Sequence, residues 1–196
     1  MHETVIIILA AGESSRMERP KQLLAFKDKT LLRHAADEAQ KSGMPFIIVL
    51  GANEKQIKED LTNVRAEIIF NETWKDGLST SIKSGLEKAL QNNSDIESCI
   101  FCVCDQPYIS ATLFQDLMDK KTASGKKIIA CSYAATMGTP VLFDKKYFDA
   151  LLNLHGNEGA KKLLQTYTEE VALITFKKGE IDIDTKVDYE ELLKAI

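Results

Sequence analysis

Apolar, strand-like runs alternate with amphipathic stretches along this chain, and that alternation constrains its fold more than any other feature of the sequence. Thr4–Ala10 is an almost continuous apolar run, as expected for a strand that is covered on both faces. The stretch that starts at Thr30 has helical periodicity and ends at Ser42 and Gly43. Repetition of this unit over about the first 120 residues predicts parallel strands joined by right-handed crossovers.

The same patterns predict the remaining elements. Further strands are expected at Phe46–Leu50, Ala66–Phe70, Cys99–Cys104, Ile128–Tyr133, Val141–Phe143, Val171–Phe176 and Ile181–Ile183. Further helices are expected at Glu54–Leu61, Ser79–Leu90, Ala111–Lys121, Lys145–Leu152, Gly159–Tyr167 and Val187–Ala195, with Ser79 and Ser110 as N-caps. We therefore predict a single α/β domain over residues 1–196, with three α/β/α layers around a mostly parallel, Rossmann-like sheet.

Charge and hydropathy exclude several classes of protein. The formal net charge is -4, whereas a general binder of nucleic acid or of anionic membranes is normally basic, so we expect neither partner. No stretch approaches the roughly 20 apolar residues of a membrane span. The N-terminus lacks the basic region of a signal peptide, which predicts a cytoplasmic protein.

The cysteines allow two interpretations. Cys99 and Cys102 form a C-x-x-C pair, which can hold a metal or carry out redox chemistry. They lie in an apolar run, however, and residues three apart on a strand point to opposite faces. We therefore favour the interpretation that they are small core side chains.

The first candidate site directly follows the first predicted strand. Leu9 and Ala10 run into the small-residue turn Ala11–Ser15, at the end of a strand where open α/β sheets place ligands. Small side chains let backbone N–H groups approach a polyphosphate, while Arg16 offers a planar fork for phosphate oxygens and Lys21 a point charge. The glycine spacing fits neither a P-loop nor a dinucleotide fingerprint. The alternative is a solvated loop with two surface cations.

The second candidate is Asp105, which follows the apolar run Ile100–Cys104 and precedes Gln106 and Pro107. A carboxylate at the end of a central strand is well placed to hold Mg²⁺, which needs one or two carboxylates beside substrate phosphates. The alternative is structural, because an Asp at this place can cap the Pro107–Ser110 turn.

The third candidate lies near the C-terminus, where Asp182, Asp184 and Asp188 stand close together. Residues two apart on a strand share a face, so Asp182 and Asp184 could converge on one cation. We favour Asp184 as the ligand. Asp184 or Thr185 can at the same time cap the last helix.

The first motif resembles the signature L-A-A-G-x-S-x-R-M-G-x-x-K of the GT-A-like nucleotidyltransferases, over the stretch from Leu9 to Lys21. In that superfamily the loop wraps the triphosphate of an NTP, and the residues that correspond to Arg16 and Lys21 steady it. The chain departs from the signature at Glu18, where the family usually has Gly, so the path of the loop around this residue stays open.

Two acidic motifs extend this resemblance. Cys104–Pro107 is similar to the C-D-x-P metal site of the same superfamily. Asp182–Tyr189 is similar to the D-I-D-T-P-E-D-Y string that completes this site, with Lys186 and Val187 in place of Pro-Glu. The resemblance implies that aspartates of both motifs bind Mg²⁺.

Three further segments resemble the molybdenum cofactor cytidylyltransferase branch. Trp74–Ser81 is similar to a W-x-x-G-x-x-x-S segment near the nucleotide base, and Gly138–Phe143 to a G-x-P-x-x-F segment beside the acceptor. Leu154–Lys161 is similar to the string L-x-G-D-x-G-A-R, with Asn157 and Lys161 in place of Asp and Arg, whereas the guanylyltransferase branch typically has L-x-G-G. The alternatives are a plain helix N-terminus for the first segment and a Gly-rich helix connection for the last.

The resemblance assigns roles to individual residues. The expected catalytic residues are Arg16, Lys21 and Asp105, and the expected metal ligands are Asp105 and Asp184. The expected nucleotide-binding residues are Leu9, Ala10, Ala11, Gly12, Glu13, Ser14, Ser15, Arg16, Lys21, Gly77, Ser79 and Ser81. The expected acceptor-binding residues are Gln106, Pro107, Gly138, Pro140, Gly156 and Gly159. The NTP-binding half then covers about residues 1–110 and the acceptor-binding half about residues 111–196.

These assignments imply Mg²⁺-dependent transfer of CMP from CTP to molybdopterin, with release of pyrophosphate and with transient contact to a molybdoenzyme or its chaperone. The alternatives among enzymes are a molybdopterin guanylyltransferase and a sugar- or polyol-phosphate nucleotidyltransferase. A glycosyltransferase on a similar sheet would usually carry D-x-D after a central strand, where this chain has Asp105-Gln106-Pro107. From another class, the alternative is a nucleotide-binding module that delivers a cofactor.

Overall fold

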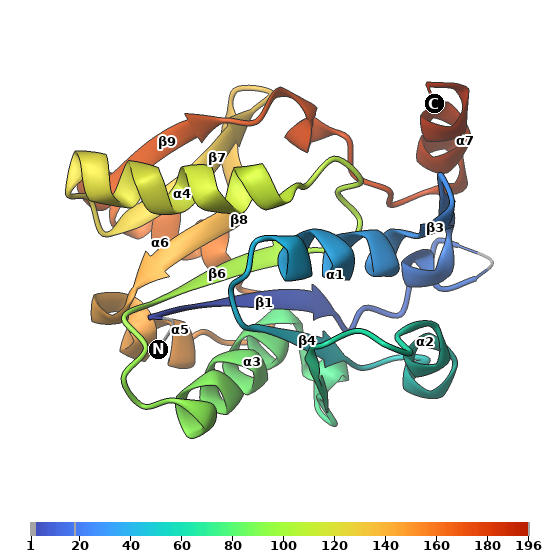
Figure 1. Cartoon of the computed structure of the whole chain (residues 1–196), viewed down its shortest axis with the longest axis horizontal. Coiled ribbons are helices and arrows are strands. Elements are labelled where there is room, and N and C mark those ends of the chain that lie inside the picture. Colours follow the sequence, from blue (N-terminus) through green and yellow to red (C-terminus); the bar gives the residue numbers. More distant parts are fainter. Residues whose placement is uncertain (1–2, 18, 196) are drawn as a thin grey trace.

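The computed structural model describes residues 3–17 and 19–195, so Glu18, where the chain departs from the family signature, lies outside the described residues. Within the described part of the chain, seven strands form one sheet in the order β5-β4-β1-β6-β8-β7-β9 (Figure 1). These strands are β1 Thr4–Ala10, β4 Phe46–Leu50, β5 Glu67–Phe70, β6 Ser98–Val103, β7 Ile128–Tyr133, β8 Thr136–Asp144 and β9 Val171–Thr175.

Neighbouring strands of this sheet run parallel except at β8, which is antiparallel to both β6 and β7. The central strand β1 pairs with β4 and β6 and is buried along its whole length, as its apolar run predicted. The mostly parallel sheet confirms the predicted fold class. Because β1, β4 and β6 run in one direction, their carboxyl ends meet at the edge that lies to the right in Figure 1.

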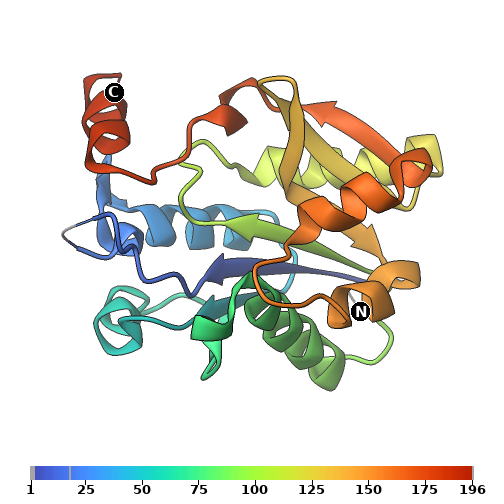
Figure 2. The same cartoon turned by 180° about the vertical axis from the view of Figure 1, so that it is seen from behind.

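Helices cover both faces of the sheet, which confirms the three-layer arrangement (Figures 1 and 2). One face carries α1 Leu31–Lys41, α2 Glu54–Asp60 and α4 Ala111–Ser124, and the other carries α3 Leu78–Asn92, α5 Phe148–Leu152 and α6 Ala160–Thr166. Side chains of alternating strand residues enter two separate apolar cores, one under each layer of helices. Ser110 caps α4, as predicted, and Thr30, where a helix was expected to start, is the N-cap of α1. Among the described residues, none of the helices is long and apolar enough to cross a membrane.

A smaller third core lies at the carboxyl edge of the sheet. It joins a short hairpin, β2 Ala25–Phe26 and β3 Lys29–Thr30, to the last helix, α7 Lys186–Lys194. Its buried side chains are Leu24, Phe26, Leu31, Ile183 and Leu192. This core holds the C-terminal segment beside the loop that follows β1, although the two are far apart in the sequence (Figure 1).

The predicted strand Ile181–Ile183 is wrong. Residues 181–184 lie outside all helices and strands and follow a 3-10 turn, Lys177–Glu180. A backbone bond from Ile183 N–H to the Asp105 carbonyl, at 3.0 Å, stands in place of a strand ladder, and the buried Ile183 side chain fills the third core. Contrary to the prediction, Asp182 and Asp184 therefore do not share a strand face.

The predicted N-cap of the third helix is also wrong. Helix α3 begins at Leu78, and Gly77, with φ of 109°, is its N-cap. Ser79 lies inside the first turn, is only 1% exposed, and donates its N–H to the Gly156 carbonyl at 3.1 Å. The Ser79 N–H is a donor of the first helical turn, which a side-chain cap would normally bond. Here the distant Gly156 carbonyl accepts it instead.

The cysteines of the C-x-x-C pair point to opposite faces, as predicted. Cys99 enters the core under α3 and Cys102 the core under α1. The two thiols therefore do not converge on one ion. Burial raises the pKa of Cys104 and Cys131 to about 12, so these thiols stay protonated at neutral pH.

The contact between α3 and the sheet gives a test of the packing. A Cβ on Gly85 would lie 2.5 Å from Ile7 and 3.1 Å from Val49, both in central strands that cannot easily move. We expect Gly85→Val to lower the free energy of unfolding by about 1–3 kcal/mol through overpacking. The control Glu87→Val introduces the same side chain on the exposed face of α3. Equal urea midpoints for the two variants would contradict this account.

Candidate active site

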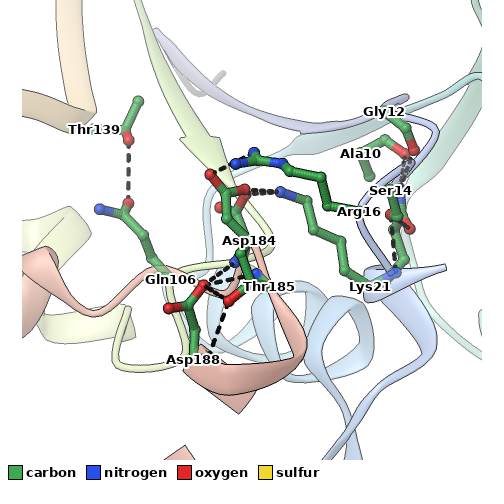
Figure 3. A network of polar contacts seen from close by, with 12 residues as sticks. Ala10, Gly12, Ser14, Arg16, Lys21, Gln106, Thr139, Asp184, Thr185 and Asp188 are labelled. Carbon is green, nitrogen blue, oxygen red and sulfur yellow. Dashed lines mark hydrogen bonds and ion pairs between the residues drawn. The ribbon is translucent and has the colours of Figure 1, made fainter. Parts of the chain in front are cut away.

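The predicted catalytic and metal-binding residues gather at the carboxyl edge of the sheet. Lys21 begins a 3-10 helix, Lys21–Leu23, after the loop that follows β1. Asp105 follows β6, and Asp184 precedes α7. Because β1 and β6 are adjacent and parallel, and the third core draws in the C-terminal segment, three distant parts of the chain meet here (Figure 3).

The loop after β1 is folded around the side chain of Gln22, which is only 1% exposed. Its Nε2 donates to the carbonyl oxygens of Ala10 and Gly12, each at 2.9 Å. Its Oε1 accepts from the Ser14 hydroxyl at 3.3 Å, and that hydroxyl oxygen accepts the Lys21 N–H at 3.0 Å. Ser14 has φ of 59°, so the loop turns back sharply at this residue. Figure 3 shows these contacts closing the loop beside Lys21.

The loop residues differ in what they can offer a ligand. The side chains of Leu9, Ala10 and Ala11 are buried in the core, so only their backbone faces the edge. The stretch from Gly12 to Arg16 is exposed apart from Ser14, which is half-buried. The loop therefore presents backbone groups and the Arg16 guanidinium, as the prediction of a phosphate-binding turn requires.

Lys21 joins the two acidic motifs. Its Nζ lies 2.5 Å from Asp105 Oδ2 and 2.9 Å from Asp184 Oδ1. Arg16 Nη2 lies 2.9 Å from Asp184 Oδ2. Asp182 is exposed and takes no part in these ion pairs. The structure thus brings together Arg16, Lys21, Asp105 and Asp184, and it favours Asp184 over Asp182.

The pKa values at this cluster follow from its charges. Burial lowers the pKa of the Lys21 ammonium, but attraction to Asp105 and hydrogen bonds to Asp105 and Asp184 outweigh burial and raise it. Burial raises the pKa of Asp184, but Lys21 and Arg16 lower it overall. Partial burial, followed by the charges of Asp184 and Asp105, raises the pKa of Asp182. Lys21 and Asp184 therefore remain charged at neutral pH.

The cluster fits a small divalent cation. Asp105 Oδ1 is buried and has no hydrogen-bond partner among the residues that the structure describes, which leaves a carboxylate oxygen available for another ligand. Lys21 already places a positive charge between the two carboxylates. In the described part of the chain, no three His, Cys, Asp or Glu side chains form a metal cage. Two carboxylates suit Mg²⁺, which takes further oxygen ligands from phosphates and water.

The segments predicted for base and acceptor contact each other. A Cβ on Gly77 would lie 2.3 Å from the Gly156 carbonyl group, so both segments depend on this glycine. Gly159 likewise packs under Leu78: a Cβ on Gly159 would lie 2.8 Å from the Leu78 side chain. Ser79 is buried, and Ser81 Oγ accepts from Asn71 Nδ2 at 3.0 Å. Contacts of the serine hydroxyls with a nucleotide stay a prediction.

The remaining acceptor-side residues lie on β8 and after β6. Gly138 packs against the Tyr133 hydroxyl, and Pro140 follows a cis peptide bond from Thr139. Pro107 and Gln106 are buried, and the Gln106 amide is bonded to protein atoms. Contact of these residues with an acceptor is also still a prediction.

Sequence reasoning missed one residue that holds the site in shape. Gln22 stands directly after Lys21, but only its burial in the folded loop reveals its role. Of the two predicted caps of the last helix, Thr185 is confirmed, and its reciprocal capping box with Asp188 at the start of α7 fixes the backbone after Asp184. The spacing of Thr185 and Asp188 was the available signal for that box, because Asp stands where a capping box has its acidic residue.

Comparison with known proteins identifies relatives of similar length. Purine catabolism protein PucB of Bacillus subtilis (strain 168) is 24% identical over 201 residues, which cover 97% of this chain and 96% of the relative. Nicotine blue oxidoreductase of Paenarthrobacter nicotinovorans is 28% identical over 200 residues, 95% of each chain. Molybdenum cofactor cytidylyltransferase of Escherichia coli (strain K12) is 30% identical over 112 residues, 57% of this chain and 56% of the relative.

Solved structures share the whole fold. Rv0371c from Mycobacterium tuberculosis H37Rv superposes with a TM-score of 0.81 at 26% identity, covering 97% of each chain. A complex of Rv0371c with manganese superposes with a TM-score of 0.80 at 25% identity, covering 98% of this chain and 99% of that one. The MobA-like NTP transferase domain matches residues 6–171, which contain Arg16, Lys21 and Asp105. The chain therefore belongs to the MobA-like NTP transferase family of nucleotidyltransferases.

Proposed function

We propose that this nucleotidyltransferase transfers CMP from CTP to molybdopterin in a Mg²⁺-dependent reaction that releases pyrophosphate. The observation that carries the proposal is the ion-pair cluster of Arg16, Lys21, Asp105 and Asp184 at the carboxyl ends of two adjacent parallel strands. Such a cluster joins cationic groups for a triphosphate to carboxylates for its metal. The NTP-binding half is about residues 1–110, and the acceptor-binding half about residues 111–196.

The chemistry needs positioning and charge neutralisation rather than a general base. A terminal phosphate oxygen of the acceptor, already an anion, forms a bond to the α-phosphorus of CTP. The bond from that phosphorus to the bridging oxygen breaks in line, and pyrophosphate leaves with the electron pair. Arg16, Lys21 and the backbone of Ala11–Ser15 bind the triphosphate and neutralise its charge. Asp105 and Asp184 would hold Mg²⁺, which when bound neutralises phosphate oxygens.

The choice of CTP and molybdopterin rests on similarity. Segments 74–81, 138–143 and 154–161 resemble the cytidylyltransferase branch, and the relative from Escherichia coli carries that activity in its name. Of the residues predicted to contact the acceptor, Gly138 and Pro140 lie on β8, where Thr139 between them bonds Gln106, and Gly156 and Gly159 lie in the loop before α6. The product would pass to a molybdoenzyme or its chaperone.

Substrate specificity is tested by pyrophosphate release. Purified protein is incubated with Mg²⁺ and CTP, GTP, UTP or ATP, each with and without molybdenum-loaded molybdopterin. We expect release with CTP and the acceptor together, and none with either alone. Release with GTP would assign a guanylyltransferase, and release with a sugar or polyol phosphate would assign a different acceptor. NTP binding without release for every pair would contradict the proposal.

Lys21 has two roles that one substitution separates. We expect Lys21→Met to lower kcat/KM for pyrophosphate release about 10²–10³-fold, because it removes a charge aimed at the triphosphate. The same change should raise the affinity of the nucleotide-free protein for Mn²⁺, because Asp105 and Asp184 lose their internal counter-ion. Steady-state kinetics and a titration followed by Mn²⁺ electron paramagnetic resonance measure the two effects.

The control for this substitution is Lys29→Met, which removes a comparable ion pair with Asp37, at 2.8 Å, outside the site. It should change neither kcat/KM for pyrophosphate release nor the affinity for Mn²⁺. Near-wild-type turnover of Lys21→Met would remove Lys21 from the scheme. Weaker binding of Mn²⁺ by that variant would show that the ammonium does not compete with a metal.

Gln22 is expected to act through the shape of the loop. Gln22→Leu leaves the Ala10 and Gly12 carbonyls without their buried donor, which costs about 1–3 kcal/mol of stability. Because the loop that binds the triphosphate is then less ordered, the KM for CTP should rise about tenfold. The control Gln91→Leu changes an exposed residue of α3. An unchanged KM in a Gln22→Leu protein that is destabilised would restrict this residue to stability alone.

A further inference from the structure

Gln106, which the sequence predicts to contact the acceptor, is a buried polar residue that the proposed transfer step itself does not use. It is 3% exposed and directly follows Asp105. Its Nε2 donates to the Gly179 carbonyl at 2.9 Å and to the Tyr133 hydroxyl at 3.4 Å, and its Oε1 accepts from the Thr139 hydroxyl at 3.1 Å. Donor and acceptor sides of the amide are both used, so it connects three segments at one point.

The segment that Gln106 ties down is the irregular one that carries Asp184. Residues 181–184 have no strand or helix of their own to fix their path. The segment is attached to the Asp105-Gln106 pair twice: Gln106 bonds the Gly179 carbonyl, and the Asp105 carbonyl accepts the Ile183 N–H at 3.0 Å. Figure 3 shows Gln106 pointing to Thr139 beside the backbone that leads to Asp184.

The packing around Gly179 makes the first of these ties specific. A Cβ on Gly179 would lie 2.5 Å from the Phe176 ring and 2.5 Å from the Tyr133 ring. The peptide at Gly179 is therefore enclosed by two aromatic side chains, and its carbonyl needs a donor from within the protein. Gln106 supplies that donor.

An uncharged amide is the group that this place requires. A carboxylate could still accept from Thr139, but it could not donate to Gly179, and it would add negative charge beside Asp105. An aliphatic side chain of the same length would leave the Gly179 carbonyl buried and unpaired, which costs free energy. Gln provides a donor and an acceptor without a charge.

We infer that Gln106 is a positioning residue that sets the place of Asp184 relative to Asp105 and connects both to Thr139 on β8. Its bearing on a metal rests on the proposed function, whereas its hold on the segment 179–184 does not. Gln106 acts through the chain that it anchors and needs no contact with the acceptor.

The decisive variant is Gln106→Met, which keeps the side-chain length and removes both hydrogen-bonding groups. We expect the Ile183 amide to exchange its hydrogen at least about tenfold faster, while amides of β1 keep their rates, because the segment loses one of its two bonds to the Asp105-Gln106 pair. With CTP present, the dissociation constant for Mn²⁺ should rise about 10- to 100-fold. We also expect kcat to fall while the KM for the acceptor stays within about twofold.

Controls separate positioning from general damage. Gln115→Met makes the same change on the exposed face of α4, where Gln115 bonds Asp119, and should alter none of these quantities. Thr139→Val should reproduce part of the Gln106→Met effect, and Thr139→Ser, which keeps the hydroxyl, should restore the wild-type values. If Gln106→Met does not fold, the same measurements are made on Gln106→Glu, Thr139→Val and Thr139→Ser.

Unchanged exchange at Ile183 in a folded Gln106→Met protein would overturn the inference. Faster exchange with unchanged Mn²⁺ affinity would show that Gln106 holds the segment but does not set the metal site, which overturns its link to Asp184. A raised acceptor KM with unchanged exchange would assign Gln106 to acceptor contact instead. If wild-type protein with CTP binds no Mn²⁺, the proposed function loses its metal site, and Ile183 exchange alone decides the inference.

Discussion

The ammonium of Lys21 lies between carboxylates from the middle and the end of the chain, and the rest of the site depends on that contact. Without a cation between them, Asp105 and Asp184 would repel each other at the edge of the sheet. With it, the protein can assemble its two acidic groups in the free state. Substrate phosphates would bring new negative charge to Lys21 and Arg16, and a bound metal would then satisfy the carboxylates. Under the proposed function, one cluster would serve first as an internal ion pair and then as a binding site.

Neutral groups hold this charged cluster in place. Gln22 on one side bonds the backbone of the loop that carries Arg16, and Gln106 on the other side bonds the segment that leads to Asp184. Buried amides can donate and accept without adding charge, so they order the backbone while leaving the electrostatics to the ionised residues. The Thr185–Asp188 capping box completes this support by fixing the start of α7.

Local pattern predicted much of the fold and part of the site. The apolar run Thr4–Ala10, the cap Ser110, and the opposite faces of Cys99 and Cys102 follow from strand and helix geometry, and all are confirmed. Pattern failed at Ile181–Ile183 and at Ser79. In both places a contact with a distant carbonyl, Asp105 or Gly156, decides the backbone path, and no window of neighbouring residues contains that partner.

The sequence by itself determined the layered α/β architecture, the strand ends that the turn Ala11–Ser15 and Asp105 follow, and the membership of a nucleotidyltransferase superfamily. These depend on periodicity and on short motifs, which neighbouring residues encode. Only the tertiary structure decided that Asp184 rather than Asp182 joins the cluster, that Gln22 and Gln106 are the groups that brace it, and that the loop at Gly156 seats on the start of α3. Each of these depends on which distant backbone groups are buried together, and burial is a property of the packed chain rather than of any one segment.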